Sequence, residues 1–158
     1  PIGDRSQWRP QWPDVEEYCV PIGEGKRTRE GQDVTLVSYG RHLLVCDKVA
    51  DQLADEGISV EVLDLRSIFP YDWQLIKSSV QKTGRVLFVN EDTEVTNFGE
   101  HLAQRVTNEL FYELLAAPQV LAGKNLPGIG LHPNLENASV PQENDVLEAT
   151  RELACQVP

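Results

Sequence analysis

The sequence predicts an α/β protein with three layers, in which helices cover both faces of a mostly parallel sheet. Two patterns support this fold class. Short runs rich in β-branched residues alternate with longer amphipathic stretches, and Gly or Pro residues separate them. Parallel strands need a crossover between them, which is usually a right-handed helix packed on the sheet. The 158 residues are enough for one such domain.

The first predicted unit is a strand, a helix and a second strand. Residues 33–38 form a β-branched run, and residues 59–65 form the next one. An amphipathic stretch lies between them, and Gly57 stands where a left-handed C-terminal cap would end a helix. The apolar face of this helix would carry Cys46, Val49, Ala50 and Leu53. The unit is therefore a βαβ crossover.

The same cycle continues along the chain. A second helix is predicted at residues 72–81 behind Pro70, and the strand 85–89 follows Gly84. One face of this helix would carry Trp73, Ile76 and Val80. A third helix begins near Phe98, because Asn97 and a glutamate three residues later form a capping-box pattern. Its buried stripe would be Leu102, Val106, Leu110 and Leu114.

The last third of the chain holds a short strand, a loop and a final helix. The strand is predicted at residues 119–122, after a proline. Residues 123–141 are rich in Gly, Pro and Asn and are predicted to be a loop. The final helix is predicted at residues 143–155. Its inward face would carry Val146, Leu147, Thr150, Leu153 and Ala154.

The composition restricts the class of partner. The formal net charge is -11, so phosphate backbones would be repelled, and we expect neither nucleic acid nor a membrane surface as a partner. The apolar runs fall far short of the roughly 20 residues that span a bilayer. A basic protein partner complements this charge better. The three cysteines share no CxxC spacing, so we expect a reducing compartment, either the cytoplasm or a matrix, and no disulfide framework.

The beginning of the chain is expected to be a connector. Residues 1–29 mix prolines, glycines and tryptophans without a sustained helix or strand period. The chain starts with Pro1 and contains no methionine, which favours an excised fragment. We therefore expect a connector at 1–29 and a folded domain at 30–158.

Nucleotide motifs are not found at the predicted strand ends, where doubly wound sheets bind ligands. The turn after the first strand has one glycine, Gly40, instead of the GxGxxG of dinucleotide sites. The segment from Gly23 to Arg27 has glycines, but Val20 and Arg27 stand where a phosphate loop requires Gly and Ser or Thr. We expect no nucleotide site.

Two side-chain pairs have both functional and structural interpretations. His42 and Cys46 lie one helical turn apart and could form a base and a nucleophile or two metal ligands, but a buried Cys46 is more often an inert apolar residue. Asp64 and Arg66 could form a functional ion pair, and a structural pair that joins strand to loop is the favoured interpretation.

The remaining histidines and one acidic loop complete the candidates. His101 and His132 are isolated in the sequence. The stretch 90–97 has the carboxylates Glu91, Asp92 and Glu94 directly after a strand, as a catalytic acid or a hard-metal site would. Because the stretch leads into a helix start, local capping is the favoured interpretation. We expect no catalytic, cofactor-binding or metal-binding residue in this chain.

Six blocks of the sequence follow one another in a fixed order. They are Val20-Pro21-Ile22-Gly23 with Gly25-Lys26, residues 31–40, residues 62–66 with Pro70 and Asp72, residues 82–85, Phe98-Gly99-Glu100, and Leu135-Glu136 with Val140-Pro141. In this order they resemble the C-terminal domain of the beta subunits of thiamine-diphosphate-dependent 2-oxo acid dehydrogenases, a transketolase-like domain. The resemblance covers about Val20 to Leu153. One departure is Asn90, where many relatives have a histidine, so no role of that histidine is transferred.

The resemblance implies a division of labour within a larger enzyme. Thiamine diphosphate and magnesium would be held between the alpha chain and an N-terminal pyrimidine-binding domain of the beta chain, and none by this domain alone. The whole enzyme would decarboxylate a branched-chain 2-oxo acid or pyruvate and transfer the acyl group to a lipoyl acyltransferase. The substrate pocket lies in other domains, so this sequence does not predict the substrate. The fragment is not expected to be catalytic alone.

The resemblance also implies partners. They would be the alpha subunit or domain, the second beta domain of the same enzyme, and the basic subunit-binding domain of the lipoyl acyltransferase. Acidic surfaces steer basic partners, and the charge of this chain leads us to expect docking at Glu143, Asp145 and Glu148 on the last helix.

Two alternatives remain open from the sequence. The domain could instead belong to a transketolase or a deoxyxylulose phosphate synthase, which act on sugar phosphates. It could also be a stand-alone α/β module that binds a small molecule, which would require a ligand pocket at the strand ends.

Overall fold

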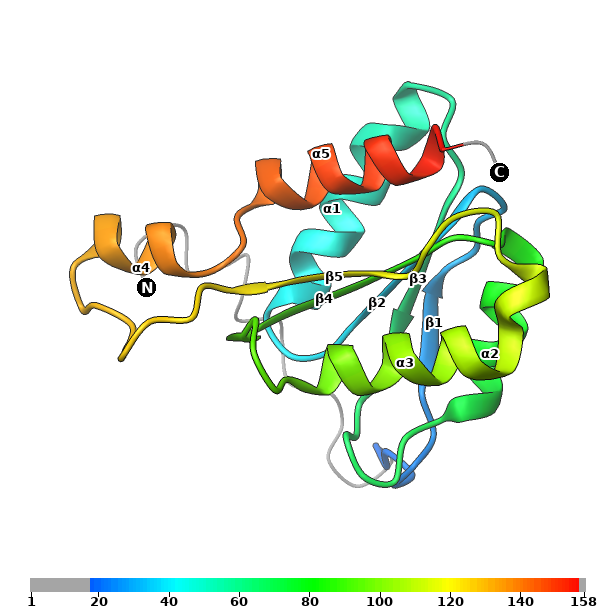
Figure 1. Cartoon of the computed structure of the whole chain (residues 1–158), viewed down its shortest axis with the longest axis horizontal. Coiled ribbons are helices and arrows are strands. Elements are labelled where there is room, and N and C mark those ends of the chain that lie inside the picture. Colours follow the sequence, from blue (N-terminus) through cyan, green and yellow to red (C-terminus); the bar gives the residue numbers. More distant parts are fainter. Residues whose placement is uncertain (1–17, 157–158) are drawn as a thin grey trace.

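The computed structural model describes residues 18–156 and shows a five-stranded sheet between two helical layers (Figure 1). The strand order is β1-β3-β2-β4-β5. The first strand pairs antiparallel with β3, and the other pairs are parallel. The predicted α/β/α fold class is confirmed. The strands are β1 (Lys26–Arg29), β2 (Val34–Ser38), β3 (Val60–Asp64), β4 (Val86–Thr93) and β5 (Gln119–Gly123).

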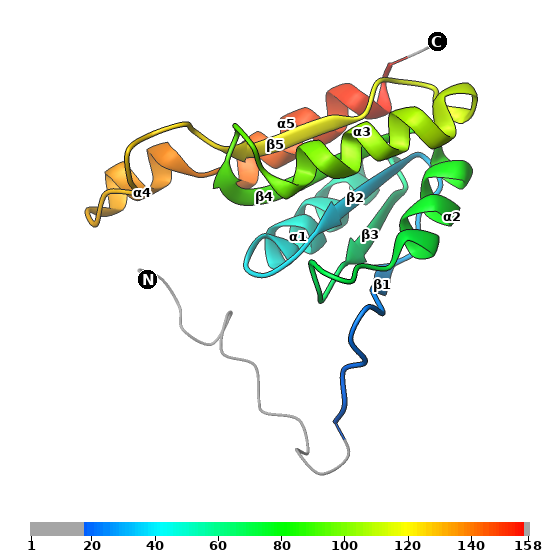
Figure 2. The same cartoon turned by 60° about the horizontal axis from the view of Figure 1, so that its bottom comes forward.

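The helices divide between the two faces of the sheet. Figures 1 and 2 show α1 and α5 on one face and α2 and α3 on the other, while α4 lies beyond the sheet. Within residues 18–156, no helix has both the length and the apolar character that crossing a membrane requires. The helices are α1 (His42–Asp55), α2 (Trp73–Thr83), α3 (Phe98–Leu110), α4 (Pro133–Ser139) and α5 (Glu143–Ala154), and a 3-10 turn at Phe111–Glu113 follows α3.

The sheet has a separate hydrophobic core on each face. One core joins α1 and α5 to side chains such as Leu36 and Val62, and the other joins α2 and α3 to side chains such as Leu63 and Phe88. The predicted apolar faces of the first two helices are buried as expected. In the third helix, the prediction that Leu114 belongs to the buried stripe of the helix is wrong, because the α-helix ends at Leu110 and a 3-10 turn follows it.

The predicted helix boundaries depend on local hydrogen bonds and glycines, and the structure shows them. The Asn97 side chain accepts from the Glu100 backbone N at 3.1 Å, and the Glu100 carboxylate accepts from the Asn97 N at 3.1 Å, which is the predicted capping box. Gly57 has a φ of 83°, in the left-handed region that favours glycine. Asp72 begins α2 by accepting from the Leu75 N at 3.0 Å.

Three segments differ from the sequence-based expectation. β1 lies inside the range 1–29, where no regular element was expected; residues 1–17 of that range lie outside the described residues. α4 lies inside the range 123–141, so the predicted uninterrupted loop is wrong. β4 continues to Thr93 and therefore includes part of the acidic stretch. Charged or short segments give weak periodicity, which explains both missed elements.

Candidate functional site

Aromatic side chains fill the carboxyl ends of the parallel strands, where a ligand site was sought. Tyr39 follows β2, Tyr71 follows β3, and Phe98 begins the helix after β4. The Tyr71 and Phe98 rings lie 5.3 Å apart, and Tyr39 and Phe98 lie 6.2 Å apart, both edge to face. His101 stacks on Phe98 at 5.8 Å. This edge of the sheet is packed with rings, which sequence reasoning missed because each ring comes from a different segment.

A polar chain joins this aromatic cluster to α3. The Arg105 Nη1 donates to the Tyr71 hydroxyl at 2.8 Å, and that hydroxyl lies 2.9 Å from the His101 Nε2. The Arg105 guanidinium also lies over the Trp73 ring, 4.1 Å from its centroid. His101, isolated in the sequence, is therefore part of a network that links α2 and α3. The network occupies its own hydrogen-bonding groups rather than presenting them to a ligand.

Two of the acidic residues after Val89 accept hydrogen bonds from backbone amides. The Asp92 carboxylate accepts from the Thr93 N at 2.8 Å, and the Glu94 carboxylate accepts from the Asn125 N at 3.1 Å. Among residues 18–156, no group of three His, Cys, Asp or Glu side chains could hold a metal ion. Burial, with the nearby Asp92 and Glu91 charges, raises the pKa of Tyr39. Neither carboxylate caps α3, whose cap is Asn97 with Glu100, so the favoured interpretation of local capping is wrong for Asp92 and Glu94.

His42 and Cys46 are both buried, and His42 has a partner outside this pair. The His42 Nε2 lies 3.0 Å from the Pro141 carbonyl oxygen, and its ring is buried. Burial raises the pKa of the Cys46 thiol to about 12, so the reactive thiolate is suppressed at neutral pH. His132 begins α4, where its Nδ1 accepts from the Asn134 N at 3.2 Å.

The predicted ion pair between Asp64 and Arg66 is wrong. Both residues are described, and the Asp64 carboxylate instead accepts from the Arg66 backbone N at 3.0 Å. Arg66 has a φ of 57°, and this hydrogen bond holds the turn at the end of β3. The residues thus shape a turn and do not pair their charges.

The glycine-rich segment before β1 does not present its amides to a phosphate. The Gly23 N donates to the Ser67 hydroxyl at 2.9 Å, and the Gly25 N donates to the Asp72 carboxylate at 3.2 Å. A phosphate loop works because such N–H groups are free to bind the anion. Here they dock the segment onto the loop between β3 and α2.

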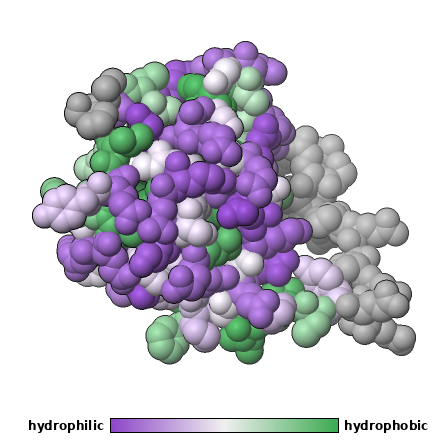
Figure 3. Space-filling view, turned by 90° about the vertical axis from the view of Figure 1, so that its right-hand side faces the viewer, coloured by the Kyte–Doolittle hydropathy of each residue, from purple (hydrophilic) through white to green (hydrophobic). Residues whose placement is uncertain are grey.

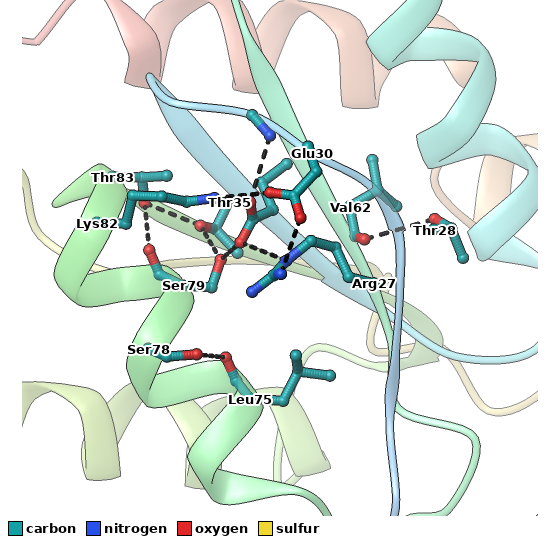
Figure 4. Close-up of polar contacts among 12 residues, drawn as sticks. Arg27, Thr28, Glu30, Thr35, Val62, Leu75, Ser78, Ser79, Lys82 and Thr83 are labelled. Carbon is teal, nitrogen blue, oxygen red and sulfur yellow. Dashed lines mark hydrogen bonds and ion pairs between the residues drawn. The ribbon is translucent and has the colours of Figure 1, made fainter.

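A buried carboxylate that sequence reasoning missed lies at the opposite end of the strands, where β2 and β3 begin. The Glu61 side chain has no exposed surface. Ser79 donates to one of its carboxylate oxygens at 2.5 Å, and the Gly31 N donates to the other at 3.2 Å. Arg27 from β1 lies 3.1 Å away, and Lys82 from α2 also pairs with it. Figure 4 shows this polar cluster between β1 and α2.

Charge compensation explains how this carboxylate is tolerated. Burial opposes the charge of Arg27, but the Glu61 and Glu30 carboxylates outweigh that effect, and the pKa of Arg27 is raised. A hydrogen bond from Lys82, together with Arg27, lowers the pKa of the exposed Glu30. The carboxylate is buried while its two cationic partners are partly exposed, so the ion pairs join β1 and α2 to β3 at the surface of the core. The signal in the sequence was the spacing of two residues between Glu61, Leu63 and Leu65, which places Glu61 on the same buried face of the strand as the two leucines.

The surface near the amino ends of these strands has no broad apolar area. Figure 3 shows the side of the molecule where β5 begins, and it is mostly hydrophilic with small, separate hydrophobic areas. A depression nearby is lined by both polar and apolar residues, including Arg29, Glu30 and Ile58. Because it lies at the amino ends of the parallel strands, its place is the reverse of that expected for a ligand site in this fold.

An arm with exposed apolar side chains follows β5 and projects beyond the sheet. We call residues 124–141, which include α4, the arm (Figure 2). Within the arm, the Lys124 N donates to the Ser139 carbonyl at 2.8 Å, and the arm contacts the rest of the domain where Arg41 pairs with Glu136 at 3.2 Å. The exposed apolar residues are Leu126 (49%), Ile129 (55%), Leu131 (100%) and Leu135 (58%). Exposed apolar side chains that gather on one segment are typical of interaction surfaces.

The family follows from a comparison with known domains. The model of the family described as "Transketolase, C-terminal domain" matches residues 23–146, most of the chain. The chain belongs to the transketolase C-terminal domain family. The family match begins before β1, so the antiparallel edge strand lies inside the matched part.

Curated proteins similar to this transketolase C-terminal domain include beta subunits of dehydrogenases. The 2-oxoisovalerate dehydrogenase subunit beta of Bacillus subtilis (strain 168) is 34% identical over 140 residues, covering 89% of this chain and 43% of that protein. The mitochondrial pyruvate dehydrogenase E1 component subunit beta-1 of Arabidopsis thaliana is 38% identical over 134 residues, covering 85% and 37%. The predicted resemblance is confirmed, and the chain spans less than half the length of these relatives.

A solved structure shows the same fold. A split-gene transketolase, described as an inactive beta4 tetramer, superposes with a TM-score of 0.78 at 24% identity. The superposition covers 92% of this chain and 48% of that one. At this identity the likeness concerns the fold of the transketolase C-terminal domain alone.

The three acidic residues chosen from the sequence lie on one helix of this transketolase C-terminal domain, with different surroundings. Glu143 accepts from the Gln52 side chain at 2.7 Å, and Asp145 accepts from the Gln142 N at 2.8 Å. Glu148 is exposed and lies near Arg151. The structure therefore places Asp145 and Glu148 on the outer face of α5, while Glu143 also joins α5 to α1.

Proposed function

We propose that this domain is the C-terminal assembly and docking domain of the beta chain of a thiamine-diphosphate-dependent 2-oxo acid dehydrogenase. The observation that carries the proposal is the exposed apolar arm, on which Leu131 is fully exposed and needs a partner to cover it. The beta-subunit names of the relatives, at 34% and 38% identity, support the dehydrogenase over the transketolase branch.

The whole enzyme would carry out the chemistry. It would decarboxylate a branched-chain 2-oxo acid or pyruvate and pass the acyl group to a lipoyl acyltransferase. The residues described here do not fit a magnesium diphosphate site, because the Asp92 and Glu94 carboxylates already accept from backbone amides and the amides of Gly23 and Gly25 are already bonded. The cofactor would accordingly be held by the alpha chain and the N-terminal beta domain. The compartment would be a reducing cytoplasm or matrix, because Cys19, Cys46 and Cys155 are free thiols.

The proposed partners are of two kinds. The arm would face the alpha subunit or another beta domain of the same enzyme, because its exposed side chains are apolar. The outer face of α5, with Glu143, Asp145 and Glu148, would receive the basic subunit-binding domain of the lipoyl acyltransferase, because opposite charges steer and orient the encounter.

The test is a calorimetric titration of the chain with that basic domain at low and high salt. We expect binding that weakens as salt increases. The Glu148→Lys variant should bind less tightly, since it reverses an exposed charge without removing a helix cap. Glu113→Lys makes the same charge change at the end of α3 and should bind as the unmodified chain does. Binding that ignores both the α5 charge and the salt would refute the docking role.

Asp145 needs a gentler change because it caps α5. Asp145→Asn keeps an oxygen that can accept from the Gln142 N while removing the charge. A loss of binding in Asp145→Asn without a change in the unfolding transition would assign the effect to charge. The same loss with a lower unfolding transition would assign it to the helix.

A further inference from the structure

The first described segment, residues 18–30, lies outside both hydrophobic cores. We call this segment, which includes β1, the strap. None of its residues is buried, and the described parts of the two cores contain only residues from Val34 onwards. The buried Gly31 follows the strap, and a Cβ there would collide with the backbone of Val60 and Glu61. The strap therefore ends at a residue that is held tightly against the start of β3.

Backbone pairing and polar contacts attach the strap to the domain. In the described sheet β1 is an edge strand that pairs with β3, and the pairing is irregular between Arg27 and Arg29. The Thr28 hydroxyl donates to the Asp47 carboxylate at 2.8 Å, and Arg29 pairs with Asp51, whose side chain is 75% exposed. Surface ion pairs contribute little to stability and are screened by salt. Segments with few buried apolar contacts open more readily than the core does.

The buried carboxylate of Glu61 has one cation on the strap and another on the folded domain behind it. Arg27 reaches it from β1 and Lys82 from α2, on the two sides of the polar cluster (Figure 4). Ser79 of α2 also donates to it, and so does the Gly31 N at the end of the strap. If the strap leaves, Arg27 goes with it and the other three partners remain. The carboxylate then still has a counter-charge and two donors, which makes such an open state chemically tolerable.

We propose that the strap undocks from β3 as a unit, with its hinge at Glu30 and Gly31, while the rest of the domain stays folded. Arg27 stabilises the closed state, whereas Lys82 pairs with Glu61 in both states. Undocking lengthens the connection to the preceding residues, because each released residue adds up to about 3.3 Å of reach. The strap thereby controls how closely the chain before residue 18 is held to this domain. This device does not depend on the docking role proposed above.

The two cations should therefore have opposite effects on the opening of the strap. Arg27→Gln removes an ion pair that exists only in the closed state, so opening should become at least about threefold more frequent. Lys82→Gln leaves Glu61 without a counter-charge once the strap opens, so opening should become at least about threefold rarer. The exposed pair between Lys82 and Glu30 acts against this second effect but contributes less. Contacts with a purely stabilising role would instead make opening more frequent in both variants.

The test is native-state hydrogen exchange of the full chain, followed for each amide by NMR. The amides of residues 26–29 that bond to β3 should exchange through an opening that leaves β2 and β4 protected. Raising sodium chloride from about 20 mM to about 500 mM should increase this opening at least about twofold, because the exposed ion pairs of the strap are screened. In each variant the opening is measured relative to the β2 amides of the same protein, so a loss of global stability does not count as opening of the strap.

Two further substitutions are controls. Lys77→Gln removes the same charge from the same helix, and none of the described contacts of Glu61 involves Lys77. It should exchange as the unmodified chain does, and so should Lys82→Arg, which keeps the charge. Protection of β1 that disappears only together with that of β2 and β4 would overturn the proposal. More frequent opening in Lys82→Gln would also overturn it, because both cations would then only fasten the strap.

Discussion

Glu61 shows how one residue can hold three elements. Its carboxylate lies on β3, and its partners come from β1, from α2 and from the turn before β2. The interior disfavours an unpaired charge, so the ion pairs and hydrogen bonds must form together for the fold to form. Because the edge strand β1 contributes Arg27, this residue also controls whether the edge strand stays in the sheet.

Glu61→Gln should destabilise the protein by about 2–4 kcal/mol, because Arg27 and Lys82 lose a buried counter-charge and the amide cannot accept all four contacts. Urea denaturation followed by circular dichroism measures the change. Glu30→Gln is the matched control, since Glu30 contacts the same two cations from the exposed side. It should leave the midpoint unchanged, and an equal loss in both variants would contradict a special role for the buried carboxylate.

Cys46 should resist modification while the chain is folded. Cys19 and Cys155 are exposed and should react with a disulfide reagent at pH 8, whereas Cys46 should react only after urea is added. The measurement is the number of thiols that react with the reagent before and after unfolding. A third thiol that reacts in the folded protein, and is lost in Cys46→Ala, would contradict the buried position.

The same thiol makes stability depend on pH at the alkaline end. Its pKa is raised from 9.0 to about 12 in the folded protein, so above pH 9 the unfolded chain loses this proton first. The stabilisation that comes from the raised pKa of Cys46 is complete below pH 9 and is lost as the pH rises towards 12. Compared with Cys46→Ala, the unmodified chain should lose more unfolding free energy between pH 9 and 11. Parallel pH curves for the two proteins would contradict this assignment.

At the scale of elements, the success of sequence reasoning followed the strength of the local signal. Strands β2 to β5 and helices α1, α2, α3 and α5 have apolar periodicity or caps, such as the Asn97 capping box, and they were predicted. β1 is a charged edge strand stabilised by partners far along the chain, and α4 spans only seven residues. The site residues were harder, because Glu61 and the aromatic cluster depend on contacts between segments that no local pattern contains.

Asp72 links two elements with its two carboxylate oxygens. One caps α2 and the other binds the Gly25 N before β1. Asp72→Ala should lower the unfolding free energy by about 1–2 kcal/mol. Asp72→Asn keeps an oxygen for the cap but places an amide nitrogen against Gly25, so it should lose less. The difference between the two urea midpoints measures the cap. Equal losses would show that the contact with Gly25 dominates.

His42 holds the end of the arm against α1. In His42→Phe, the Pro141 carbonyl loses its buried hydrogen-bond partner, and we expect a loss of about 1–3 kcal/mol. Amide exchange in residues 124–141 should become faster. Arg41→Ala is the control, because the Arg41 pair with Glu136 is exposed and should contribute less than about 1 kcal/mol. Unchanged exchange in His42→Phe would mean that the arm is held by other contacts.

The whole molecule divides its charge between its two helical layers. α1 and α5 together contain seven acidic and two basic residues, whereas α2 and α3 contain two acidic and three basic ones. One face of the sheet is therefore acidic and the other nearly neutral, with the uncharged β5 edge between them. A basic partner approaching at random would be turned toward the acidic layer, because the field of the whole surface acts before contact.

This asymmetry should be visible in the rate at which a basic domain associates. Reversing Glu148 and Glu152 on α5 should lower the association rate about three- to tenfold at low salt and flatten its dependence on ionic strength. The dissociation rate should change less, since exposed charges act mainly on the encounter. Stopped-flow mixing at several salt concentrations measures both rates. The matched control reverses Glu91 and Glu113, which belong to neither α1 nor α5. If that pair slowed association as much, net charge would govern the encounter and the layered arrangement would have no part in it.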